Sequence, residues 1–257
     1  MKKGMIFLYV MVMISFCQLV CFSAPVQMPL DMDEGNSSNI INLVGEYDSL
    51  VERGLDVASG SIENAEISSL RAVGQFDLDS VTGNLYASIG NASGIEYKAK
   101  LNGSDVQFKL DDALAWGVGI TFELSKDNDT FLRNFIDLSY RSIAPDYYES
   151  VTVGGVESSG TALDPKLRAG YSEFQAALGV CKKIGNFIPY GGVTISRVDV
   201  RAEATIGGTP YCLTTNSDQM FSAFGGCKLI VNDQISLEAQ ARAGAEEAVT
   251  VRGVYSF

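Results

Sequence analysis

The sequence predicts an all-β protein, specifically a closed antiparallel transmembrane β-barrel of about ten strands. Three observations predict this fold: a C-terminal segment that alternates between apolar and polar residues, internal segments with the same alternation, and connections that are alternately short and long. Residues that alternate with period two point to opposite sides of a strand, so each segment has one apolar and one polar face. Strands of this kind are typical of barrels that cross a membrane, with lipid outside and a polar interior.

The last strand is expected over residues 246–257 and shows the alternation clearly. Its apolar face ends in two aromatic residues next to the carboxyl terminus. Soluble proteins rarely end in this way, whereas aromatic residues of a membrane barrel gather at the lipid–water interface. The residues of this outward face are Val249, Val251, Gly253, Tyr255 and Phe257.

The first segment, residues 1–24, is interpreted as a secretory signal peptide, because two lysines precede an unbroken apolar run. Small residues follow, so cleavage is expected after Ser23 or Ala24. An uncleaved membrane anchor and lipidation at Cys21 are the alternatives, although no small residue stands just before that cysteine. We therefore expect export, followed by a flexible periplasmic lead-in over the polar and acidic residues 25–39.

The formal net charge is −12, and it becomes −14 if Lys2 and Lys3 leave with the signal peptide. Such an acidic chain lacks the basic surface that nucleic acids require, so no nucleic-acid partner is expected. Beyond the signal, no apolar run is long enough for a transmembrane helix, so a spanning structure would have to be a closed barrel. An odd number of cysteines remains after the signal, which argues against a disulfide framework. They are Cys181, Cys212 and Cys227.

Residues 40–257 are expected to form the barrel. The strongest internal strand covers residues 114–125, whose alternation is about as long as a tilted transmembrane strand requires. The first strand is the least regular, because Glu52 and Arg53 are adjacent, and a helix over residues 46–55 is an alternative there. If the first two segments stayed outside the sheet, the barrel would have eight strands. The ten expected strands are 40–56, 66–78, 84–100, 114–125, 132–141, 167–183, 187–205, 221–231, 235–242 and 246–257.

The connections between these strands fall into two alternating groups. Short turns are expected around 79–83, 126–129, 185–186 and 232–233. Longer or more variable loops are expected around 58–63, 101–105, 142–166, 207–218 and 244–247. A barrel with short periplasmic turns and longer extracellular loops shows this alternation, and an even strand number places both termini in the periplasm.

The chain resembles the small Gram-negative outer-membrane β-barrels of the opacity-protein and porin-like group. The resemblance implies a location in the cell outer membrane, contact with outer-membrane lipid, and insertion by the barrel-assembly machinery. It also implies that Tyr255 and Phe257 form the recognition signal for insertion. The group includes adhesins, structural barrels and small pores, so the fold does not decide the function. The segments that carry the resemblance are 45–56, 84–94, 113–124, 187–193 and 249–257.

The residue inventory argues against the enzymes known on such barrels. Outer-membrane proteases of this size use aspartate with histidine, and outer-membrane lipases use serine with histidine, but this sequence contains no histidine. The usual general base for these nucleophiles is therefore absent. Scattered cysteines without histidine offer no metal-ligand spacing either. A mechanism built on aspartate and glutamate alone is the alternative, because Glu123, Asp137, Glu173 and Glu238 are expected to point inward. We expect no enzyme activity, no catalytic residues, no cofactor and no metal site.

Charged residues on the inward parity are expected to form a network of ion pairs in the lumen, because buried charges must be paired. Such a network predicts a largely plugged barrel with a structural or surface-interaction, adhesin-like role. A small porin-like diffusion channel for small solutes is the alternative. Loop 142–166 is the candidate contact for a host or cell-surface ligand. The residues of the expected network are Glu123, Arg133, Asp137, Arg141, Glu173, Lys228, Glu238, Arg242 and Arg252.

Overall fold

Fifteen β-strands form one continuous antiparallel sheet in the computed structural model. The structure describes residues 25–28, 41–55, 60–78, 81–101, 103–127, 132–144, 148–159, 168–206 and 209–257. Within these ranges, no helix is long and apolar enough to cross a membrane. The strands are β1 (Ile41–Leu55), β2 (Gly60–Glu63), β3 (Glu66–Leu78), β4 (Val81–Ser93), β5 (Glu96–Leu101), β6 (Ser104–Leu110), β7 (Ala113–Asp127), β8 (Leu132–Ala144), β9 (Tyr148–Val153), β10 (Val156–Ser159), β11 (Arg168–Lys182), β12 (Phe187–Ile206), β13 (Thr209–Ile230), β14 (Ile235–Ala243) and β15 (Glu246–Ser256).

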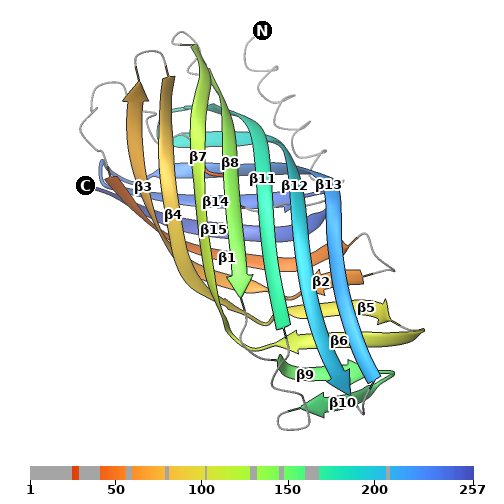
Figure 1. The fold of residues 1–257 in the computed structure, drawn as a ribbon. Helices are drawn as coiled ribbons and strands as arrows, with labels where there is room; N and C mark the ends of the chain where they lie inside the picture. Colours follow the sequence, from red (N-terminus) through yellow and green to blue (C-terminus); the bar gives the residue numbers. More distant parts are fainter. Residues whose placement is uncertain are drawn as a thin grey trace.

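Ten of these strands close into a barrel, in the order β1-β15-β14-β13-β12-β11-β8-β7-β4-β3 (Figure 1). The barrel closes because β3 pairs back onto β1, with a register that runs from Ile41↔Gly74 to Ser49↔Glu66. The predicted barrel of ten strands is confirmed. The eight-strand alternative is wrong, because the first two predicted segments are the very strands, β1 and β3, that complete the closure.

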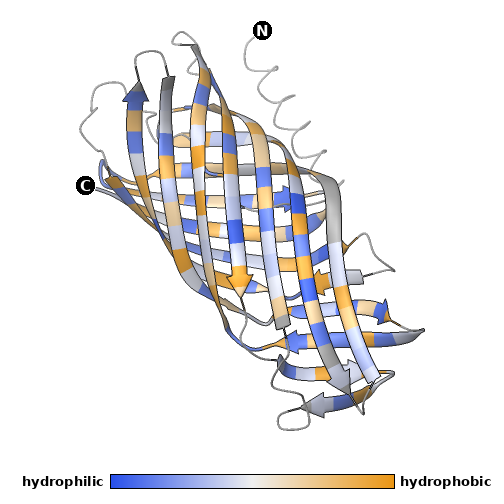
Figure 2. Ribbon diagram, viewed as in Figure 1, coloured by the Kyte–Doolittle hydropathy of each residue, from blue (hydrophilic) through white to orange (hydrophobic). Residues whose placement is uncertain are grey.

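The outer surface of the barrel carries many large hydrophobic side chains that point away from the lumen. Figure 2 shows hydrophobic and hydrophilic residues alternating along the strands. On β7, Leu114, Trp116 and Val118 are exposed, whereas Ala115 and Thr121 are buried inside. A soluble protein rarely exposes so many large apolar side chains in a continuous belt. Even the shortest barrel strand, β14, has 9 residues, which suffice for a tilted strand to cross a bilayer.

The irregular phase of the first strand is explained by a β-bulge. The register between β1 and β15 shifts between Leu50 and Glu52, so Val51 and Glu52 both lie on the exposed side. The bulge therefore returns Arg53 to the interior, where its side chain is fully buried. The helical alternative for residues 46–55 is wrong, because this stretch pairs with β15 and then with β2.

The turns at residues 185–186 and 232–233 lie where the sequence predicts them, but the long loops contain additional strands. Residues 142–166 include the end of β8 and the hairpin β9–β10, which turns at Gly154 and Gly155. Both glycines have positive φ, of 57° and 85°, as a two-residue type I′ hairpin requires. The predicted loop 207–218 is wrong, because β12 and β13 stay paired as far as Ile206↔Thr209.

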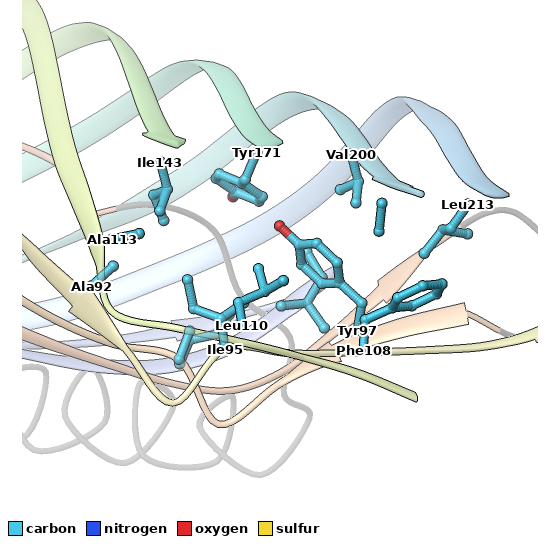
Figure 3. Close-up of a cluster of buried hydrophobic side chains, with 14 of the residues drawn as sticks. Ala92, Ile95, Tyr97, Phe108, Leu110, Ala113, Ile143, Tyr171, Val200 and Leu213 are labelled. Carbon is cyan, nitrogen blue, oxygen red and sulfur yellow. The ribbon is translucent and has the colours of Figure 1, made fainter. Parts of the chain in front are cut away.

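Strands β2, β5, β6, β9 and β10 form a sheet that we call the loop-side extension, at the barrel end opposite the carboxyl terminus (Figure 1). It continues from the last residues of β1, because β2 pairs with Glu52–Leu55. Its inner face packs against the long ends of β12 and β13 and encloses an apolar core (Figure 3). Tyr97 and Phe108 of the extension face Val200 and Leu213 there. The loop end of the barrel is thus covered by an apolar layer.

Candidate functional site

The lumen of the barrel is filled by inward side chains, and its central layer is a closed ring of six charges. Each arginine of this charge ring contacts two carboxylates, and each carboxylate contacts two arginines. The ring is drawn from five strands, β1, β8, β11, β14 and β15, so it crosses the interior instead of lining one wall. Around the ring, the nitrogen–oxygen contacts are Arg53–Glu173 (2.7 Å), Glu173–Arg141 (3.1 Å), Arg141–Asp48 (2.9 Å), Asp48–Arg242 (2.5 Å), Arg242–Glu246 (3.3 Å) and Glu246–Arg53.

The charge ring is buried and neutral. Its most exposed side chain is that of Arg141, at 15 %, and the other five side chains are at most 1 % exposed. Neutral partners support it: Thr250 donates to Asp48 (2.7 Å), and the Tyr171 hydroxyl donates to Glu173 (2.9 Å). Buried charges are tolerated only when paired and hydrogen-bonded in this way, so the loss of one member would leave its partners uncompensated.

A second charged group, the lower cluster, lies nearer the barrel end that carries the carboxyl terminus. Arg71 contacts Glu46 at 2.8 Å, and Arg252 contacts both Glu46 (2.7 Å) and Glu238 (2.5 Å). The Arg71 guanidinium also lies 4.7 Å from the centre of the Tyr86 ring, a geometry favourable for a cation–π contact. The lower cluster links β3, β1, β15 and β14, and it also carries equal numbers of positive and negative side chains.

Asp137 is placed in the lumen but is held mainly by neutral donors. It accepts hydrogen bonds from the Tyr86 hydroxyl (3.0 Å), from the Thr121 hydroxyl (2.8 Å) and from the backbone N–H of Gln27 (3.4 Å). The Tyr86 ring packs where Gly119 offers no side chain, since a Cβ there would come within 2.2 Å of that ring. This glycine therefore makes room for an aromatic residue in the lumen.

Four residues of the expected lead-in, Pro25–Met28, lie inside the barrel. Val26, Gln27 and Met28 are each at most 3 % exposed. For these residues the expectation of a flexible lead-in is wrong, because the lumen supplies partners for both their backbone and their side chains. Residues 29–39, and the predicted signal peptide 1–24, lie outside the described residues.

An apolar cluster, which we call the terminal-side cluster, fills the lumen between Asp137 and the barrel end that carries the carboxyl terminus. It contains Val26 and Met28 together with aromatic and aliphatic residues of β8, β11, β12 and β13. Its strand members are Phe135, Ala177, Cys181, Ile188, Tyr190 and Phe224.

An ion pair and a small cavity lie beside this cluster. Arg133 contacts Glu123 at 2.9 Å. A small cavity remains beside Pro25, with Glu46, Arg71 and Arg141 among its lining residues.

All nine residues of the predicted charge network point inward, but they are not one network. Arg141, Glu173 and Arg242 belong to the charge ring, and Glu238 and Arg252 belong to the lower cluster. Glu123 pairs with Arg133 separately. Lys228 is buried at 8 % exposure, and Asp137 stands apart as described above.

Sequence reasoning missed five charged residues that complete the ring and the lower cluster. Three of them lie on the first barrel strand, β1, which was the least regular of the predicted strands. The alternation of inward Glu46 and Asp48 with outward Tyr47 was a usable signal. The inward direction of Arg53 could not be read from the alternation, because the bulge reverses which residues of β1 face the lumen beyond Leu50. The missed residues are Glu46, Asp48, Arg53, Arg71 and Glu246.

The aromatic residues of the predicted insertion signal lie on the outside of the barrel. Tyr255 and Phe257 are exposed, and their rings form an edge-to-face pair with 5.0 Å between centroids. The backbone N–H of Phe257 donates to the carbonyl of Ile41 at 3.3 Å, so the end of the chain is tied to the start of β1.

The chemistry available in the lumen is that of charge pairing. Within the described ranges, no group of three or more histidine, cysteine or acidic side chains could hold a metal ion. The described cysteines carry thiols: Cys181 is buried, Cys212 is exposed, and Cys227 is half-buried.

No family model matches the chain, and no curated protein matches it. Among solved structures, it is similar to the translocator domain of the autotransporter NalP from Neisseria meningitidis (10 % identity, 87 % of this chain and 90 % of that chain, TM-score 0.46). It is also similar to the outer-membrane protease OmpT from Escherichia coli (10 %, 86 % and 98 %, TM-score 0.46). A third similar structure is an outer-membrane channel from Pseudomonas putida F1 (13 %, 90 % and 100 %, TM-score 0.41).

These similar structures differ in their stated activities, and at such identities and TM-scores they decide nothing about function. The fold rests instead on the strand order and register described above. The chain is a closed antiparallel β-barrel of ten strands with many large hydrophobic side chains on its outer surface.

Proposed function

We propose that this protein is an outer-membrane barrel with a structural or surface-interaction role and a closed lumen. The observation that carries the proposal is the charge ring, which crosses the interior with neutral overall charge and almost no exposure. The apolar outer belt supports contact with outer-membrane lipid. The proposal includes export by the signal peptide 1–24 and insertion by the barrel-assembly machinery.

Closure of the lumen follows from three successive layers. The apolar core of the loop-side extension covers one end, the charge ring and the lower cluster fill the middle, and the terminal-side cluster fills the other end. A solute would have to separate ion pairs that lie away from water, and each uncompensated charge costs several kcal/mol. Steady passage of solutes is therefore opposed at every level of the barrel.

The loop-side extension is the surface we propose for contact with a host or another cell. Within predicted loop 142–166, the hairpin β9–β10 forms the outer edge of the extension. Because β10 ends the order of described strands, one of its edges has no described strand beside it, and Val156 on it is 72 % exposed. Exposed strand edges are the usual template for adding a strand from another chain.

The same interior argues against catalysis. The buried carboxylates of the ring and of the lower cluster are each engaged by arginine, and the chain has no histidine to act as a base. One similar structure is a protease, but that activity belongs to that protein. We therefore propose a non-enzymatic role without catalytic residues or cofactor.

Solute entry into liposomes tests the closed lumen. Liposomes that contain the refolded mature protein should swell in an isotonic solution of a small sugar no faster than protein-free liposomes. Rapid swelling would favour the alternative, a small diffusion channel for small solutes.

Cell adhesion tests the surface role. Cells that produce the protein should adhere to a cell monolayer more strongly than cells producing a variant in which residues 148–159 are replaced by a short turn. Both proteins should reach the outer membrane in equal amounts, because the hairpin lies outside the barrel wall. Equal adhesion of the two strains would contradict the proposed role of this hairpin in contact with other cells.

A further inference from the structure

We propose that the lumen holds a peptide-binding site, and that its occupant is the chain's own segment Pro25–Met28, which becomes the N-terminal end of the mature protein. This inference rests on the proposed export, because removal of the signal peptide is what creates that end. The ligand is a short extended peptide with apolar side chains at its second and fourth residues.

Polar side chains of the barrel recognise the backbone of the segment. Gln240 of β14 binds Val26 at two points: its side-chain oxygen accepts from the backbone N–H (3.1 Å), and its amide donates to the carbonyl (3.3 Å). Arg252 donates a further hydrogen bond to the same carbonyl at 3.0 Å. These contacts satisfy the backbone in a buried place, where unpaired polar groups are costly.

The next residue is held from the opposite side of the lumen. The backbone N–H of Gln27 donates to Asp137 (3.4 Å), and its carbonyl oxygen lies 3.4 Å from the Thr121 hydroxyl, which itself donates to Asp137. The side-chain oxygen of Gln27 accepts from Arg71 at 3.0 Å. Asp137, Thr121 and Arg71 come from β8, β7 and β3, so the segment bridges two walls of the barrel.

Apolar anchoring completes the site. Val26 and Met28 belong to the terminal-side cluster and are 0 % and 2 % exposed. Full burial of such apolar side chains is favourable relative to their exposure to water. The strands alone do not force the segment into the lumen, because the chain between Met28 and Ile41 could extend roughly 45 Å. The contacts of Pro25–Met28 with the barrel must therefore hold this segment in the lumen.

The position of the segment agrees with the predicted cleavage site. Cleavage after Ala24 would leave Pro25 as the first residue, beside the small lumenal cavity that Glu46, Arg71 and Arg141 also help to line. Cleavage after Ser23 would add one small residue in front of it. If cleavage follows Ser23 or Ala24, the buried segment therefore lies at the start of the mature chain.

A native cysteine makes the site testable. Cys181 is 2 % exposed and lies in the same apolar cluster as Val26 and Met28. In a background with Cys212→Ser and Cys227→Ser, it would be the remaining thiol of the mature chain. The rate at which a small, water-soluble thiol reagent modifies Cys181 in the folded protein therefore reports whether the segment is in place.

Three variants and one matched control define the experiment. Deletion of residues 25–28, Val26→Asp and Gln240→Ala should each weaken or remove the occupant, whereas deletion of residues 31–34 shortens the lead-in and leaves the segment intact. We expect the deletion of 25–28 and Val26→Asp to speed the modification of Cys181 by about tenfold or more, with a smaller increase for Gln240→Ala. The control should react at the wild-type rate. Folding of each protein is checked by its heat-modifiable migration on a gel.

Equal rates in all folded variants would overturn the proposal. A mature N-terminus after Met28, measured by intact-protein mass, would overturn it as well, because the occupant would then be missing. Closure of the lumen is a separate outcome: the charge ring remains in the variant lacking 25–28, so this variant should stay impermeable to sugars. Permeability in that variant would count against the closed lumen, and not against the binding site.

Discussion

Arg53 of β1 and Glu173 of β11 meet inside the barrel with 2.7 Å between Nη1 and Oε1. Four strands separate β1 from β11 on either side of the barrel, so this ion pair joins opposite walls. The two residues are 120 positions apart in the sequence. A pair of this kind fixes the width of the lumen and occupies its centre.

Replacement of Arg53 with methionine should destabilise the barrel by about 3–5 kcal/mol, because Glu173 and Glu246 would each lose a buried partner. Trp116, the one tryptophan of the chain, reports unfolding in urea by its fluorescence. Arg201→Met is the matched control. Arg201 is 52 % exposed in its pair with Glu203, and exposed pairs contribute at most about 1 kcal/mol. Equal losses in both variants would contradict the structural role of the ring.

Replacement of Phe108 with alanine should loosen the loop-side extension and leave the barrel intact. Phe108 is fully buried in the apolar core, and truncations of this kind cost about 3–5 kcal/mol. Limited proteolysis should therefore cut the extension faster, while heat-modifiable migration stays unchanged. Val156→Ala, at a position 72 % exposed on β10, should leave the cutting rate near that of the wild type.

Deletion of Phe257 should reduce insertion into the outer membrane while export continues. Its side chain is 65 % exposed, so the refolded variant should unfold in urea close to the wild-type midpoint. Fractionation of cells measures the inserted protein, and removal of the signal peptide measures export. Phe187→Ala, at another exposed aromatic position on the turn side of the barrel, serves as control. If insertion is unchanged without Phe257, this residue is an interfacial aromatic residue and not part of an insertion signal.

Alternation alone predicted most of the barrel and the direction of most lumenal charges. The apolar residues of β7, β11, β14 and β15 face outward as expected, because period two leaves only one phase that buries the charges. Partner choice could not be predicted in this way. Asp48 and Arg242 meet at 2.5 Å across 194 residues of sequence. They come together because β15 pairs with β1 on one side and with β14 on the other.

The inward position of Arg53 and the burial of Pro25–Met28 could not be predicted from the sequence, for separate physical reasons. A bulge inserts one residue and reverses the parity beyond it, so the inward position of Arg53 depends on a local irregularity with no strong sequence signal. The segment Pro25–Met28 is too short to show any periodicity, and its burial depends on contacts such as that with Gln240 on a distant strand. Long-range contacts decide both.

Ion conductance in a planar bilayer tests the central claim, which is that the charge ring closes the lumen. The wild-type protein should show little or no steady current. Arg242→Ser removes one ring member, leaves Asp48 and Glu246 without it, and should permit a leaky current, whereas the exposed control Arg201→Ser should stay silent. A steady wild-type current that Arg242→Ser does not change would contradict the closed lumen and favour a small diffusion channel.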